Sequence, residues 1–200
     1  KAKKDLEHLG VQVLTNTQVT NIQENEVILG DKVIETRNVI WAAGNEAAPL
    51  LQTLDTELDR QKRVIVKNDL SLPKHPNIFV IGDAAHVKNE KNELLPGIAP
   101  VAIQEAQYVA RIIQEQTVEE KRAPFLYRDK GSMATIGKAK AIVVIGKWKL
   151  HGFLAWLFWC FIHIFYLIGF RNRFSVMLEW CYWYVSEQRS SRLIYHSIKE

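Results

Sequence analysis

A Gly-Asp pair at the end of an apolar segment is the part of the sequence that most clearly indicates chemistry. Residues 77–83 read Asn-Ile-Phe-Val-Ile-Gly-Asp, a continuous apolar run typical of buried parallel strands. Gly82 would let a ligand approach the backbone, and Asp83 would lie where α/β sheets bind ligands, at the carboxyl end of a strand. An aspartate at this position can accept hydrogen bonds from sugar hydroxyls, but it is also a common turn or capping residue.

Two further segments favour the ligand-binding interpretation. Residues 39–44, Val-Ile-Trp-Ala-Ala-Gly, are an apolar run that ends in small residues, and they predict a second strand. Residues 95–106, Leu-Pro-Gly-Ile-Ala-Pro-Val-Ala-Ile-Gln-Glu-Ala, lead into a helix that the apolar spacing predicts over 98–116. The first N–H groups of such a helix can face an electron-rich ligand.

The other elements would position these segments. A short helix is expected to end at Gly10, and alternating residues over 17–34, with turns at Asn25 and Gly30-Asp31, predict a β-meander. Pro49–Leu54 is read as a linker or short helix. Further strands are predicted over 11–15, 63–66, 69–72, 130–135 and 141–145.

Together with residues 127–137, the three motif segments resemble the C-terminal half of type II NADH dehydrogenases, the single-subunit FAD-containing NADH:quinone oxidoreductases. The resemblance implies an α/β fold: the C-terminal part of a two-dinucleotide-binding-domain, Rossmann-like flavoprotein, followed by a C-terminal membrane-associated helical segment. It also implies FAD as cofactor, NADH as substrate, and non-proton-pumping transfer of two electrons to a membrane quinone.

The same resemblance suggests how the chain is organised. Residues 1–44 would end the NADH-binding domain, 45–120 would form the C-terminal part of the FAD-binding domain, 121–149 a strand-rich connection, and 150–200 membrane-anchoring amphipathic helices. No Gly-x-Gly occurs among the ten glycines, so both glycine-rich dinucleotide fingerprints are expected upstream of Lys1. The isolated chain is therefore expected to be inactive and to contain none of the catalytic residues.

Site residues follow from the resemblance position by position. Asp83 would bind the ribityl chain of FAD, and the full set expected at the cofactor is Ala43, Gly44, Gly82, Asp83, Ala99, Pro100 and Val101. Pro100 replaces a Gln of the family motif, so any quinone hydrogen bond made by that Gln would be absent or supplied elsewhere. The residues expected at a quinone pocket are Ala102, Ile103, Gln104, Trp159, Ile162 and His163. The last three of these are also compatible with lipid-facing anchors.

The C-terminal quarter differs in kind from the rest. No Asp, Glu, Lys or Arg occurs from Leu150 to Phe170, while Lys147, Lys149, Arg171 and Arg173 flank this run. Residues 174–188 carry a polar stripe at helical spacing. A transmembrane helix and a buried core helix both remain open. Spread-out Trp and Tyr and an amphipathic second helix favour a helix pair lying in the membrane interface.

Charge and composition exclude other classes of function. Residues 1–120 hold 13 basic and 18 acidic side chains, whereas 121–200 hold 13 and 4. The basic residues of the second part flank an apolar run rather than forming a patch, so nucleic-acid binding is not expected. The histidines lack metal-ligand spacing, and no metal is expected. The expected protein is peripheral (monotopic), on the cytoplasmic face of a bacterial inner membrane, with a homodimer possible. The alternatives are a soluble FAD-dependent NAD(P)H reductase and a non-enzymatic membrane-associated flavoprotein.

Overall fold

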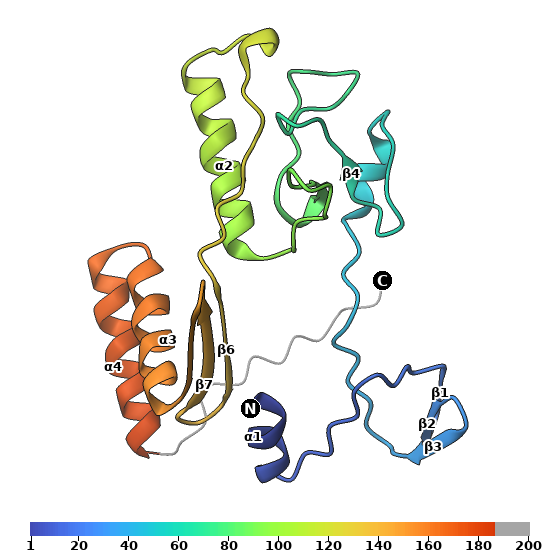
Figure 1. The fold of residues 1–200 in the computed structure, drawn as a ribbon, viewed down its shortest axis with the longest axis vertical. Coiled ribbons are helices and arrows are strands. Elements are labelled where there is room, and N and C mark those ends of the chain that lie inside the picture. Colours follow the sequence, from blue (N-terminus) through green and yellow to red (C-terminus); the bar gives the residue numbers. More distant parts are fainter. Residues whose placement is uncertain (187–200) are drawn as a thin grey trace, which may run out of the picture. The chain divides into compact units, whose positions relative to one another are not determined.

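The computed structural model describes residues 1–186, and these fall into two compact units (Figure 1). The central unit comprises Thr17–Lys130. The terminal unit combines Lys1–Asn16 with the chain from Gly131 onward. Each unit has its own cluster of buried apolar side chains. The predicted division at residues 44, 120 and 149 stays a prediction.

The central unit begins with the expected β-meander. Strands β1 (Asn21–Gln23), β2 (Glu26–Leu29) and β3 (Lys32–Glu35) pair antiparallel in chain order. Their register places Val27 opposite Ile34, so the two β-branched side chains pack on one face. Gly30, at φ +64°, allows the tight turn between β2 and β3.

Beyond the meander, the central unit is built around a short parallel pair and one long helix. A 3₁₀ helix, η1 (Pro49–Thr53), precedes β4 (Val64–Ile65), which pairs parallel to β5 (Ala85–His86). Helix α2 (Ala99–Gln114) follows, and a last 3₁₀ turn, η3 (Glu119–Lys121), comes after it. The core-facing residues of α2 recur every three or four positions, as an amphipathic helix requires: Val101, Glu105, Val109 and Ile112.

The terminal unit is a three-stranded antiparallel sheet covered by helices. Strands β6 (Ser132–Gly137), β7 (Lys140–Ile145) and β8 (Trp148–Gly152) pair in chain order, and α1 (Ala2–His8) packs beside β6 and β7. Helix α3 (Phe153–Tyr166) lies on β7, and α4 (Phe170–Ser186) pairs with α3. Ala141 and Ala155 are completely buried, because two small side chains let the helix approach the sheet closely.

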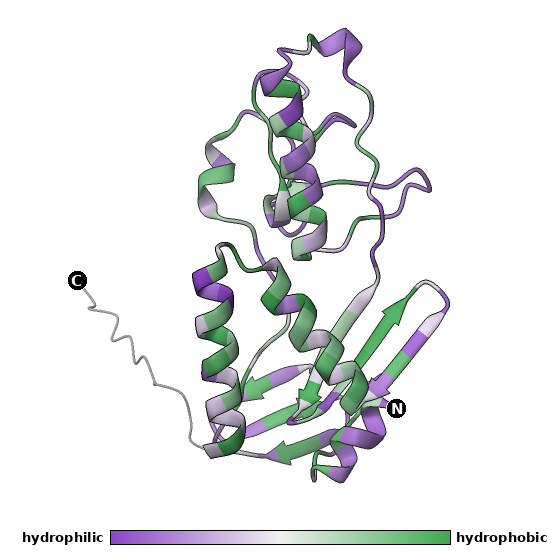
Figure 2. Cartoon of the chain, turned by 90° about the vertical axis from the view of Figure 1, so that its left-hand side faces the viewer, coloured by the Kyte–Doolittle hydropathy of each residue, from purple (hydrophilic) through white to green (hydrophobic). Residues whose placement is uncertain are grey.

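The uncharged run from 150 to 170 is not one helix. Leu150–Gly152 belong to β8, Gly152 turns the chain at φ +77°, and Gly169 turns it again at φ +81° before α4. Across residues 1–186, no helix is both long enough and apolar enough to cross a bilayer. Figure 2 shows that α3 is hydrophobic along nearly its whole length, whereas α4 begins with hydrophilic residues. The part of the second predicted helix at 187–188 lies outside the described residues.

Four predicted strands are wrong, and one of them is 69–72, where residues 68–70 turn and Ser71 forms only an isolated bridge. Residues 11–15 and 39–44 have no regular secondary structure, and within residues 1–186 no strand pairs with either segment. Residues 77–83 contribute only an isolated bridge between Phe79 and Ser71, followed by a 3₁₀ turn, η2 (Gly82–Ala84). A strand needs a neighbour for its backbone N–H and C=O groups, and apolar composition alone does not supply one.

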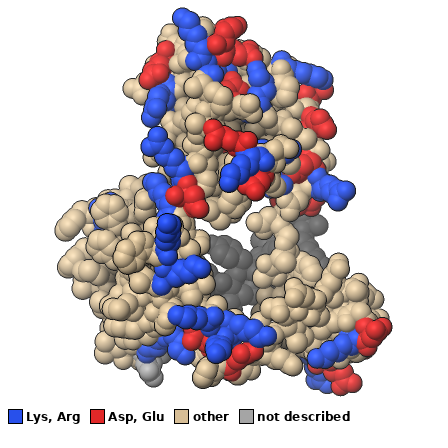
Figure 3. Space-filling view, in the orientation of Figure 1, with Lys and Arg blue, Asp and Glu red and all other residues tan. Residues whose placement is uncertain are grey.

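Charged side chains are also distributed differently in the two units. Figure 3 shows acidic and basic side chains intermingled over the central unit, whereas the surface over α3 and α4 is largely uncharged. Such a surface indicates a partner other than water.

Gly131 gives a direct test of the packing where β6 begins. A Cβ at Gly131 would lie 2.3 Å from the carbonyl oxygen of Val144, and the residue has φ +93°. Gly10, with φ +84°, has no atom within 4 Å of the place that a Cβ would occupy. We expect Gly131→Ala to lower the free energy of unfolding by about 1–3 kcal/mol more than Gly10→Ala does, because only the first adds overpacking to backbone strain. Urea unfolding of both variants measures this, and equal losses would contradict the described β6–β7 packing.

Candidate functional site

The Gly82–Asp83 turn is the centre of the candidate site. Ile81 is extended, and Gly82 then takes φ +66°, a left-handed conformation that favours glycine. The 3₁₀ turn η2 begins at Gly82 and carries Asp83, which is exposed and lines a pocket. The predicted Gly-Asp pair is therefore present as a turn, and its glycine is required by backbone conformation.

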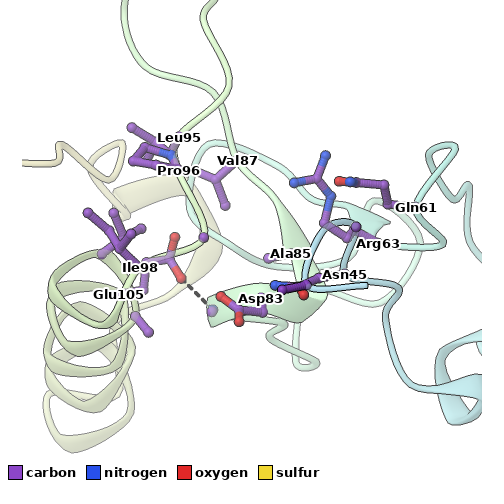
Figure 4. Close-up of a pocket in the computed structure, with 16 residues that line it drawn as sticks. Asn45, Gln61, Arg63, Asp83, Ala85, Val87, Leu95, Pro96, Ile98 and Glu105 are labelled. Carbon is purple, nitrogen blue, oxygen red and sulfur yellow. Dashed lines mark hydrogen bonds between the residues drawn. The ribbon is translucent and has the colours of Figure 1, made fainter. Parts of the chain in front are cut away.

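A buried carboxylate from α2 holds this turn. The backbone N–H of Gly82 donates to Oε2 of Glu105 at 2.5 Å, and Glu105 is only 1% exposed. Figure 4 shows the Glu105 carboxylate pointing from α2 toward the turn that carries Asp83. Burial raises the pKa of Glu105, the Gly82 N–H partly opposes the rise, and the nearby Asp83 adds to it.

A glycine also lies beside the Asp83 carboxylate. A Cβ on Gly97 would lie 3.1 Å from Oδ1 of Asp83, tighter than an ordinary contact. Gly97 belongs to the Pro-Gly step that leads into α2, and the first turn of that helix lies beside the same space. The absence of a side chain at position 97 thus leaves room for Asp83 and for what it binds.

These residues line a pocket within the central unit. Its volume is about 310 Å³, at the lower end of the range for small-molecule sites, so it fits part of a large cofactor rather than a whole one. Backbone and small side chains form much of the wall. The lining residues are Ala42, Gly44, Asn45, Gln61, Arg63, Gly82, Asp83, Ala85, Val87, Leu95, Pro96, Gly97, Ile98, Val101, Ala102 and Glu105.

An ion-pair cluster fixes the Arg63 side of the pocket. Asp59 accepts hydrogen bonds from Nε of Arg63 at 2.8 Å and from Nδ1 of His86 at 2.9 Å, and its other oxygen accepts the backbone N–H groups of Gln61 and Arg63. Burial by itself raises the pKa of Asp59, but the hydrogen bonds from His86 and Arg63 outweigh it and hold the pKa well below its usual range. The guanidinium of Arg63 is thereby kept at the pocket wall.

The residues expected at the cofactor are only partly brought together. Gly44, Gly82, Asp83 and Val101 line the pocket, whereas Ala43, Ala99 and Pro100 do not. Apart from Asp83, the sequence interpretation missed the polar lining residues Asn45, Gln61, Arg63 and Glu105, of which Glu105 had a visible signal. It is an acidic residue on the apolar face of the predicted helix, and an unpaired charge is rare at a core position.

The residues expected at a quinone pocket lie in both units. Ala102, Ile103 and Gln104 are on α2, while Trp159, Ile162 and His163 are on α3. The Gln104 amide pairs with the backbone of one residue, because its Nε2 donates to the carbonyl of Arg128 and its Oε1 accepts the Arg128 N–H, both at 3.0 Å. Gln104 thus fixes the segment that returns along α2.

A second, apolar pocket lies between α3, α4 and the sheet of the terminal unit. Its volume is about 930 Å³, and Trp159 is among the lining residues. The indole of Trp159 stacks on His163 with centroids 3.9 Å apart and on Trp180 with centroids 5.6 Å apart. Nδ1 of His163 lies 2.8 Å from the Trp159 carbonyl, which can only accept, so Nδ1 carries a proton and Nε2 is left to interact outward.

Comparison with known proteins places this geometry in a family. Residues 1–106 match the model of the pyridine nucleotide-disulphide oxidoreductase family. The chain belongs to this family. Residues 130–188 match the NDH2 C-terminal domain, so the resemblance to type II NADH dehydrogenases is confirmed.

Individual relatives agree with this assignment. Two type II NADH:quinone oxidoreductases of Mycobacterium tuberculosis, Ndh and NdhA, are each 38% identical, over 97% and 90% of this chain and 43% and 40% of their own lengths. The chain thus spans about two-fifths of these curated relatives. The structure of NDH2 from Plasmodium falciparum in complex with NADH matches with a TM-score of 0.75 at 19% identity, over 91% of this chain and 53% of that one, which shows a shared fold.

The Asp59 cluster predicts a pH-dependent contribution to stability. Because the folded pKa of Asp59 is lowered, its stabilisation is present above the unfolded pKa of about 3.9 and is lost as pH falls below it. We expect Asp59→Asn to cost about 2 kcal/mol of unfolding free energy at pH 7, with a smaller cost toward pH 3. Urea unfolding between pH 3 and 7 measures this, and the exposed Asp31→Asn is the control. A cost that stays constant or grows with acid would contradict the cluster.

Proposed function

We propose that the protein that carries this chain is an FAD-dependent NADH:quinone oxidoreductase of the type II class, and that the chain supplies the sugar-alcohol side of the FAD site. The observation that carries this proposal is the Gly82–Asp83 turn, which projects a carboxylate into a pocket walled by Gly97 and the first turn of α2. The membership of the chain in the pyridine nucleotide-disulphide oxidoreductase family supports it.

The pocket residues fit part of a dinucleotide cofactor. Asp83 accepts hydrogen bonds from the hydroxyls of the ribityl chain, and the missing Cβ at Gly97 leaves the space for them. The N-terminal turn of α2 directs the positive end of a helix dipole into the pocket, where it favours an electron-rich atom. When bound, FAD supplies hydride acceptance from NADH and electron transfer onward, and the protein contributes binding, orientation and electrostatics.

The proposed electron acceptor is a membrane quinone. In this proposal the candidate quinone-contacting residues are Ala102 and Ile103 in the central unit and, in the terminal unit, Trp159, Ile162 and His163, while Gln104 fixes the backbone at Arg128. A Trp side chain can stack on a quinone ring, and the outward Nε2 of a His can donate to a quinone carbonyl. The name of the M. tuberculosis relatives, NADH:quinone oxidoreductase, supports this acceptor class.

We further propose that α3 rests on the membrane surface. Four exposed apolar side chains recur every three or four residues along the helix, on the side away from the buried Ala155: Leu154, Leu157, Phe161 and Phe165. Basic residues stand on both flanks, at Lys147, Lys149, Arg171 and Arg173. An apolar stripe bordered by cations is typical of helices that lie in one leaflet. The cytoplasmic face of a bacterial inner membrane remains the proposed location, and a homodimer remains possible within this proposal.

The cofactor part of the proposal predicts the effect of removing Asp83. We expect Asp83→Ala to weaken FAD binding about ten- to a hundredfold, because a hydrogen bond to a charged group is worth about 1.5–3 kcal/mol. Titration of the apoprotein with FAD, followed by quenching of flavin fluorescence, measures the dissociation constant. Asp55→Ala, which removes a carboxylate that is 76% exposed and pairs with Lys74, is the control and should leave it unchanged. Unchanged affinity in Asp83→Ala would reject the assigned FAD site.

The proposed membrane contact of α3 predicts that vesicle binding and quinone reduction are lost together, while reduction of a water-soluble acceptor is kept. Leu154 is 70% exposed and Phe161 is 64% exposed, so changing both to Asp should abolish vesicle binding with little effect on the fold. In vesicles that contain a quinone, we expect this double variant to lose NADH-dependent quinone reduction while reduction of ferricyanide in solution stays normal. Leu50→Asp, at a 74% exposed position of η1, is the matched control. Full quinone reduction by the double variant, or an equal loss with ferricyanide, would contradict the proposed path.

A further inference from the structure

Glu105 is the most unusual buried group of the central unit. It occupies a position on the core-facing side of α2 between Val101 and Val109, and its side chain is 1% exposed. A carboxylate at such a position is costly unless it is hydrogen-bonded. Across residues 1–186, no salt bridge compensates it, and its hydrogen-bond partner is the Gly82 N–H.

Glu105 accepts a hydrogen bond from the Gly82 N–H, a backbone group that has no acceptor within the turn η2. The first N–H groups of a helical turn have no acceptor within it, and no side chain caps η2 locally. Glu105, 23 residues further along the chain, supplies that acceptor from α2. The bond therefore ties the turn to the long helix at the residue immediately before Asp83.

The same arrangement brings two carboxylates close together. Burial raises the pKa of Glu105, and the nearby Asp83 adds to this rise. An apolar residue at position 105 would avoid both this repulsion and the burial of a polar group. The placement of Glu105 is therefore expected to serve the orientation of the turn rather than the stability of the core.

We propose that Glu105 is a positioning residue of the cofactor site: by holding the Gly82 amide, it orients the Asp83 carboxylate into the pocket. This inference rests on the proposed FAD site. Glu105 also lines the pocket, so the test has to separate an effect that passes through Asp83 from a direct one. Gly97 lies close to the Asp83 carboxylate, since a Cβ at position 97 would be 3.1 Å from its Oδ1.

Two substitutions at position 105 separate hydrogen bonding from packing. Glu105→Gln keeps an oxygen that accepts the Gly82 N–H, and we expect its FAD dissociation constant to stay within about threefold of the wild-type value. Glu105→Leu removes the acceptor, and we expect about tenfold weaker binding, since a lost hydrogen bond to a buried group costs about 1–3 kcal/mol. If Leu prevents folding, Glu105→Met, which is unbranched as Glu is, replaces it.

A double-mutant cycle tests whether the effect passes through Asp83. The probe is FAD, titrated into the apoprotein by fluorescence quenching, and thermal melting of each apoprotein confirms folding. We expect Glu105→Leu to add no more than about twofold in the Asp83→Ala background, because coupled residues are non-additive. Multiplicative losses, or a Gln variant as weak as Leu, would overturn the positioning role while leaving the FAD site intact. Unchanged affinity in Asp83→Ala alone would instead reject the FAD site itself.

Discussion

One hydrogen bond, from the Gly82 N–H to the Glu105 carboxylate, governs the geometry of the candidate site. It joins the turn at Gly82 to helix α2. Glycine adopts the conformation of this turn readily, and apolar packing at Val101 and Val109 sets the register of the helix. The depth of α2 in the core therefore determines where Asp83 stands. A shift of the helix by even a fraction of a turn would move the carboxylate out of the pocket, because the packed core does not deform continuously.

The terminal unit is organised around the contact between its sheet and helix α3. Its sheet packs against Ala155 and against Trp156, Phe158 and Trp159 of α3. Other large apolar side chains of the same helix stay exposed: Leu154, Leu157, Phe161 and Phe165. Trp159 links the two helices by stacking on Trp180, which stiffens the pair without filling the pocket between them. A unit built in this way leaves apolar side chains exposed, which supports the proposed contact of α3 with a membrane surface.

The sequence predicted turn residues and helix positions well, whereas it did not show which apolar runs have a partner strand. The turn residues Asn25 and Gly30 correctly indicated the β-meander, and apolar spacing located α2 within one or two residues. The Gly82–Asp83 pair was recognised by residue type, but it was assigned to a strand end because an apolar run does not reveal whether a partner strand lies beside it. Arg63 and Gln61 reach the pocket through tertiary packing, which residue spacing along the chain does not encode, whereas Glu105 was visible as an acidic residue on the apolar face of the predicted helix. The interpretation of the uncharged run at 150–170 likewise did not include the two points, Gly152 and Gly169, at which the chain turns.

The most direct test of the account is a structure of the FAD-loaded protein that carries this chain. The account predicts that an Asp83 carboxylate oxygen lies within about 3.2 Å of a ribityl hydroxyl. It also predicts that Glu105 still accepts the Gly82 N–H behind it. A cofactor bound without contact to Asp83, or an Asp83 side chain turned to solvent in the loaded protein, would contradict the central claim.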